Sequence, residues 1–207
     1  MSSIIMHIYI SQKVQKELGL SNKFLAGSIL PDMIKIKTKE RDETHYIKEY
    51  DNGRKRLPDL DKYLDENKDK LNDEVIIGYY AHLIEDRIWF DTYIDTFAKC
   101  IDKDNVLYTE DNSVHNTSDF RKDMYADYVS VDMYLIEKNN LDIDKIRTDI
   151  MQELKGYDVD EVIEENVVFP SKVNNARIKF ISDYCLNNYI NESTEMVKEK
   201  IKEILGE

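Results

Sequence analysis

The segment that most constrains the fold is residues 78–87, which read GYYAHLIEDR. A helix turns about 100° per residue, so a helix through this segment carries His82 and Asp86 one turn apart on one side. Aromatic residues share that side, which indicates that it is buried: Tyr79, Trp89, Phe90 and Tyr93. A buried carboxylate is costly unless it is paired or binds a metal. The partner of Asp86 is therefore a divalent cation shared with His82, an arginine, or a core histidine that Asp86 orients.

Long helices are expected elsewhere as well, because 6 glycines and 3 prolines leave few breakers among 207 residues. Apolar periodicity predicts helices over 4–18, 24–30, 59–71, 74–101, 118–138, 142–155, 158–167, 171–189 and 193–205. Pro31 is expected to end the second helix, and residues 33–58 and 102–117 to be irregular. Expected helix caps are Thr117 or Ser118, Asp142, Ser171 and Ser193. No strand pattern is evident, so we expect an all-α, multi-helix bundle with a metal site between helices. It would form a single helical domain over 1–207, with the metal-site core in 1–138 and the helices of 142–205 packed on it.

Charge and hydropathy exclude some classes of partner. The net charge of −13 argues against binding to a nucleic-acid backbone. No run approaches the ~20 apolar residues of a transmembrane helix, and residues 1–10 do not read as a secretory signal. Two cysteines are too few for a disulfide framework. These features predict a cytoplasmic protein.

Three residues upstream have the right chemistry to join His82 and Asp86 as metal ligands. His7 lies on the apolar side of the first helix, Asp32 follows Pro31, and His45 follows Thr44. Taken one at a time, they are better explained as a core histidine, a loop carboxylate and a surface histidine. Their order along the chain favours the metal-binding interpretation.

That order is His7, then FLAGSILPD ending at Asp32, then Thr44-His45-Tyr46, then the GxxxHxxxD helix ending at Asp86. Over residues 1 to about 100, with a weaker tail to about 135, the chain resembles the zinc-dependent phospholipase C family. The resemblance implies an all-helical phospholipase C/nuclease-like bundle with up to three zinc ions in a cleft. It also implies five metal ligands: His7, Asp32, His45, His82 and Asp86.

The chain departs from this family in several places. Secreted members use a processed N-terminal tryptophan and a further histidine shortly after the helix aspartate, and both are missing here. In place of a later His-x-x-x-Glu pair, the chain offers Asp123 and Asp127, or His115 and Asp119. We prefer Asp123 and Asp127, which share one side of a predicted helix, although a solvated acidic face explains them too. With fewer histidines and more carboxylates, two metals or a harder metal such as manganese or iron becomes an alternative to zinc.

The resemblance implies hydrolysis of a small-molecule or lipid phosphoester by metal-activated water, with Asp32 as general base. Tyr46, Tyr79 or Arg87 would help to grip the phosphate. One alternative is an HD-type phosphohydrolase acting on nucleotides, but its signature is a His-Asp dipeptide, which this sequence lacks. Another is a non-catalytic helical protein with a structural metal centre. The oligomeric state is left open.

Overall fold

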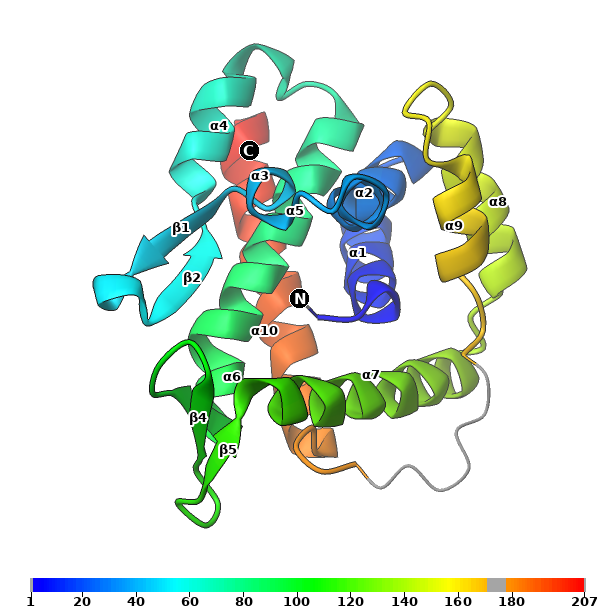
Figure 1. Cartoon of the computed structure of the whole chain (residues 1–207). Coiled ribbons are helices and arrows are strands. Elements are labelled where there is room, and N and C mark those ends of the chain that lie inside the picture. The colour runs from blue at the N-terminus through cyan, green and yellow to red at the C-terminus, as the bar shows by residue number, and fades with distance from the viewer. Residues whose placement is uncertain (1, 171–177, 207) are drawn as a thin grey trace.

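The computed structural model describes residues 2–170 and 178–206, and helices dominate them (Figure 1). The α-helices are α1 (Ile4–Leu18), α2 (Asn22–Thr38), α3 (Arg41–Thr44), α4 (Leu60–Asn67), α5 (Glu74–Ile88), α6 (Ile94–Phe97), α7 (Thr117–Asn139), α8 (Ile143–Glu153), α9 (Asp160–Asn166) and α10 (Asp183–Leu205). The strands are β1 (Ile47–Tyr50), β2 (Lys55–Pro58), β3 (Ala98–Cys100), β4 (Asn105–Tyr108) and β5 (Val114–Asn116).

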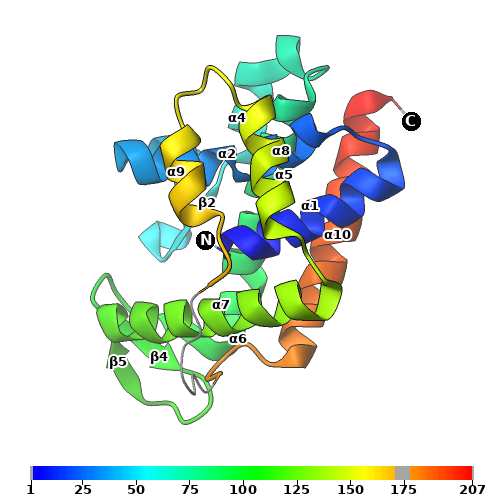
Figure 2. The ribbon, with the colours of Figure 1, turned by 90° about the vertical axis from the view of Figure 1, so that its right-hand side faces the viewer.

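The centre of the molecule is built from α1, α2 and α5. Helix α10 packs against α1 and α5, while α8 and α9 pack against α2. Figures 1 and 2 show α7 running across one end of this group, where it contacts α1. Fully buried side chains fill the space between these helices, among them Met6, Ile29, Leu83 and Trp89. Among the described residues, no helix combines the length and the apolar character needed to cross a membrane.

Two glycines allow α2 and α5 to approach each other closely. A Cβ atom on Gly27 would overlap the carbonyl oxygen of Val75, and one on Gly78 would overlap the carbonyl oxygen of Phe24. Only glycine permits backbones to come this near. The contact therefore fixes the distance between the two helices that carry Asp32, His82 and Asp86.

Helix α2 is longer than the sequence predicts. Pro31 was expected to end it, yet the helix continues through Pro31 to Thr38. A proline inside a helix loses one hydrogen bond and costs about 3 kcal/mol. Burial of the residues around it, including Leu30 and Met33, offsets this cost. The extra turns keep Asp32 on the helix and direct it inward.

Two small antiparallel sheets correct the all-α prediction. Strands β1 and β2 form a hairpin with Ile47 opposite Pro58, and β3, β4 and β5 form a second sheet in that order. The turn of the hairpin contains Asn52 and Gly53, both with positive φ. These strands have three or four residues each, too few for an alternating pattern to stand out. Residues 47–58 and 105–116 are thus more regular than predicted, while residues 98–100, predicted to be helical, form strand β3.

The remaining helix predictions differ mainly at their ends. Helix α5 stops at Ile88 and is followed by a π-helical turn, Trp89–Tyr93, and by α6. Asn116 caps α7 in place of Thr117 or Ser118, whereas Asp142 caps α8 as predicted. The expected helices over 171–189 and 193–205 are replaced by α10, which contains Ser193, and residues 178–182 are not helical. Ser171 and the rest of 171–177 lie outside the described residues.

Candidate metal centre

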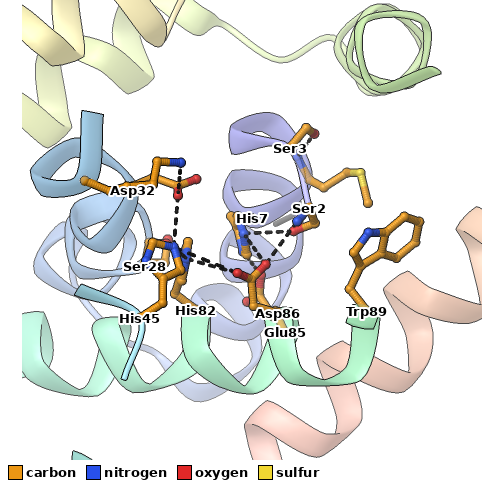
Figure 3. A network of polar contacts seen from close by, with 12 residues as sticks. Ser2, Ser3, His7, Ser28, Asp32, His45, His82, Glu85, Asp86 and Trp89 are labelled. Atoms are coloured by element: carbon orange, nitrogen blue, oxygen red, sulfur yellow. Dashed lines mark hydrogen bonds and ion pairs between the residues drawn. The ribbon is translucent and has the colours of Figure 1, made fainter. Parts of the chain in front are cut away.

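Five of the predicted ligands meet in the interior, between α1, α2 and α5 (Figure 3). His7 comes from α1, Asp32 from α2, His45 from the residue after α3, and both His82 and Asp86 from α5. All five side chains are fully buried, with exposed fractions of 0 to 1%. We call these five residues the His/Asp cluster.

The core of the cluster is formed by two imidazoles and one carboxylate. The Nε2 atoms of His45 and His82 lie 3.3 Å apart, and each is 3.9 Å from Oδ2 of Asp86. Ligands on a tetrahedral zinc ion, with bonds of about 2.0–2.1 Å, lie roughly 3.3 Å apart. The three atoms are thus spaced almost as they would be around one cation. A second group that could hold an ion consists of His7, Asp32 and His82, so His82 belongs to both.

Hydrogen bonds at the other ring nitrogens set the tautomers. Nδ1 of His82 lies 2.8 Å from the carbonyl oxygen of Ser28, which can only accept, so Nδ1 carries the proton. Nδ1 of His45 lies 2.9 Å from Oγ1 of Thr44, whose own hydroxyl donates to the carbonyl of Glu40 at 3.0 Å. In their neutral forms, both imidazoles therefore present a lone pair at Nε2. Two facing lone pairs repel each other unless a proton or a metal ion lies between them.

Two carboxylate oxygens in the cluster lack a partner. Oδ2 of Asp32 and Oδ2 of Asp86 are buried and accept no hydrogen bond within the described part of the chain. Oδ1 of Asp32, in contrast, has two polar neighbours, His45 Nε2 at 3.1 Å and Lys35 Nζ at 3.0 Å. Buried, unpaired carboxylate oxygens are unfavourable. A divalent cation held by His45, His82 and Asp86 would satisfy Oδ2 of Asp86 and both lone pairs, and Asp32 belongs to the second ligand group, so the residues present fit metal binding.

The electrostatics of the cluster also suit metal binding. Burial lowers the pKa of His82 well below its usual value, which keeps its imidazole neutral as a ligand must be. Burial alone would raise the pKa of Asp32, but its contacts with His45 and with the ammonium group of Lys35 hold it well below its usual range. Asp32 is therefore ionised and ready to coordinate a cation.

Glu85 was not predicted as part of the site, yet it lies in direct contact with it. Its Oε2 atom is 2.6 Å from Nδ1 of His7, and both side chains have 0% exposure. Burial raises the pKa of Glu85 to about 7, while burial of His7 is outweighed by its hydrogen bonds to Asp86 and Glu85, which raise its pKa to about 10. The sequence did hold a signal, because a charged residue beside Asp86 on an entirely buried stretch of helix requires a partner.

Ser2 closes the cluster from the N-terminal side. Its backbone N–H donates to Oδ1 of Asp86 at 3.0 Å, and its hydroxyl lies 2.8 Å from Nε2 of His7. Ser3 caps α1 and donates a hydrogen bond to Asp132 of α7. No motif in the sequence predicts these contacts, because a single serine is compatible with many roles.

The preferred carboxylates on α7 contact a different part of the chain. Both oxygens of Asp127 accept backbone N–H groups, from Lys179 at 2.8 Å and from Phe180 and Ile181 at 2.7 and 3.0 Å. Asp123 pairs with the side chain of Lys179 at 2.6 Å. The structure therefore does not bring these two residues into the His/Asp cluster. Their spacing along one side of α7 serves instead to hold the segment before α10.

The other candidates also lie elsewhere. His115 stacks on Tyr108 and contacts Oγ of Ser113 at 2.6 Å, and Asp119 is exposed in the first turn of α7. Arg87 donates to the carbonyl of Pro58 at 2.7 Å, so it supports the β1–β2 hairpin.

The two tyrosines proposed to grip a phosphate stand beside the cluster. Tyr79 donates its hydroxyl proton to the carbonyl of Thr44, next to His45. Tyr46 packs edge-on against Tyr63 and Tyr79. Tyr79 therefore helps to hold the backbone next to His45, and Tyr46 packs against Tyr79.

Comparisons of the chain with protein-family models, with curated proteins and with solved structures found no match.

Proposed function

We propose that this protein is a metal-dependent phosphoric ester hydrolase similar to the zinc-dependent phospholipases C. One observation carries the proposal: two imidazole nitrogens and an unpaired carboxylate oxygen, 3.3 to 3.9 Å apart, face one another in the protein interior. Imidazole and carboxylate are the ligands of hydrolytic metal sites. The order of these residues in the chain gives further support, because it resembles the order described above for the zinc-dependent phospholipase C family.

In this proposal His45, His82 and Asp86 hold the principal ion, and His7 and Asp32 extend the site. A bound divalent cation lowers the pKa of water and neutralises charge on a phosphoryl group. Asp32 orients the attacking water by accepting a hydrogen bond at Oδ2, while Lys35 holds its Oδ1. The low pKa of Asp32 suits orientation of the water better than lasting uptake of its proton.

Zinc is the proposed metal, with manganese or iron as the alternatives that three carboxylates in and beside the site allow. We propose that the site binds at most two metal ions. His82 is common to both ligand groups, and Asp123 and Asp127, which would have completed a third position, bind the segment before α10.

One feature favours a second candidate, a non-catalytic metal centre. The five side chains of the His/Asp cluster are 0 to 1% exposed, so a phosphoester reaches them only if the cover over the site opens. Structural metal sites are closed in this way, whereas catalytic sites keep a position open to water. A stable metal content without turnover would identify this second function.

The deciding experiment measures metal and turnover in the same preparations. Elemental analysis is followed by assays with p-nitrophenyl phosphate, bis(p-nitrophenyl) phosphate and phosphatidylcholine vesicles, which separate soluble monoesters, soluble diesters and lipid. We expect wild type to contain metal and cleave a phosphoester, and His82→Ala to lose both. His115→Ala is the matched control, because this histidine lies outside the cluster, and it should keep both. Wild-type protein that neither contains nor binds a divalent metal would refute both candidates.

A further inference from the structure

We propose that Glu85 is a positioning residue for the metal centre, acting through His7. Its carboxylate oxygen lies 2.6 Å from Nδ1 of His7, deep in the interior. This contact directs the opposite nitrogen, Nε2, toward Asp86, whose Oδ1 lies 3.5 Å away. The inference rests on the metal centre of the proposed function, but not on hydrolysis.

The orientation of His7 is fixed by ring stacking in addition to its polar contacts, which include the hydroxyl of Ser2 at 2.8 Å from Nε2. Its ring stacks on that of His82, with centroids 3.9 Å apart and planes 22° apart. Stacking fixes the plane of the ring but not which nitrogen faces the cluster. Glu85 makes that choice, because a carboxylate at one ring nitrogen holds a proton there and leaves the other nitrogen to bind an ion, which displaces the proton from it.

Glu85 itself is directed away from the ion positions. Its second oxygen, Oε1, faces the hydroxyl of Ser11 at 3.5 Å. Neither of the two ligand groups found among the described residues includes Glu85. A support of this kind also explains why a buried helix face retains a second carboxylate beside Asp86, since burial of an unpaired carboxylate is unfavourable.

Helix α5 therefore supplies both metal ligands and the residue that positions His7. His82 and Asp86 would bind the ion, while Glu85, one residue before Asp86, holds a histidine that comes from α1 (Figure 3). Supporting carboxylates of this type typically contribute about 10- to 100-fold to metal affinity.

The test measures zinc affinity by competition with a chromophoric chelator. Glu85→Gln keeps an oxygen that accepts the Nδ1 proton but removes the charge, and it should bind zinc about 10- to 100-fold more weakly than wild type. Glu192→Gln is the control, because Glu192 contacts the hydroxyl of Tyr93 and not the cluster; its affinity should equal that of wild type. If Glu85→Gln does not fold, Glu85→Asp, which withdraws the carboxylate by one methylene, takes its place with the same expectation.

A double-mutant cycle separates positioning from a general structural effect. If Glu85 acts through His7, the variant combining His7→Ala with Glu85→Gln should bind zinc as His7→Ala alone does. Ring 15N chemical shifts of His7 supply a second readout: the Nδ1-protonated tautomer should dominate in zinc-bound wild type and lose ground in Glu85→Gln. Equal affinities of wild type and Glu85→Gln, or fully additive losses in the cycle, would overturn the inference. Absence of zinc binding by wild type would instead refute the metal centre on which it rests.

Discussion

At the scale of single residues, the three histidines of the cluster are oriented in the same way. Each has Nδ1 in contact with an oxygen and Nε2 turned inward, and the oxygens belong to Glu85 for His7, Thr44 for His45 and Ser28 for His82. The sequence revealed which side chains have metal-binding chemistry, because residue type and order are visible in it. It could not reveal their supports, since one of them is a backbone carbonyl that any residue provides.

Asp127 provides the residue-scale prediction, because both its oxygens accept backbone N–H groups of residues 179–181. Asp127→Ala should leave these donors without their partner and lower the free energy of unfolding by about 3 kcal/mol. The metal content should not change. Asp123→Ala, which removes a partly exposed ion pair with Lys179 and a long hydrogen bond from Tyr108, should cost less than about 1 kcal/mol. Urea unfolding and elemental analysis test both variants, and loss of metal from folded Asp127→Ala would restore Asp127 as a ligand.

At the scale of elements, the crossing of α2 and α5 positions the centre. Gly27 and Gly78 bring the two backbones together, and at this crossing the carbonyl of Ser28 accepts the Nδ1 proton of His82. Apolar periodicity predicted both helices. It could not predict that α2 continues past Pro31, because that depends on how much apolar surface α2 buries against its neighbours.

Gly78→Ala tests this crossing. Alanine is favoured over glycine in a helix by about 1 kcal/mol, but its methyl group would collide with the carbonyl of Phe24. We expect net destabilisation of about 1–3 kcal/mol, together with weaker zinc binding because His82 moves away from Ser28. Gly19→Ala is the control, because no atom lies within 4 Å of its added methyl group. It should lose about 1 kcal/mol from its positive φ alone and bind zinc normally. A stabilised Gly78→Ala variant with full zinc affinity would show that the close crossing is unimportant.

At the scale of the whole molecule, the proposed centre joins segments that are distant in the chain. Its ligands extend from His7 near the N-terminus to Asp86 after the middle of α5, and the helices that carry them pack around a fully buried polar cluster. The order of these residues in the sequence, through its resemblance to a metal-binding family, predicted that the side chains are brought together. It did not indicate how completely they are shielded from solvent, since that depends on Ser2 and on the packing of several elements at once.

Removal of metal should therefore lower the free energy of unfolding of the whole protein. An ion bound only by the folded state stabilises it by about 2.7 kcal/mol at a concentration 100 times its Kd. For a chain of this size, 1 kcal/mol corresponds to roughly 2–4 °C in Tm, so a chelator should lower Tm by about 5–10 °C in differential scanning calorimetry. His115→Ala should respond in the same way, whereas Asp86→Asn, which alters the carboxylate at the core of the cluster, should not respond. If wild type unfolds at the same temperature with saturating zinc and with chelator, the buried lone pairs and carboxylate oxygens are satisfied by protons rather than by a metal ion.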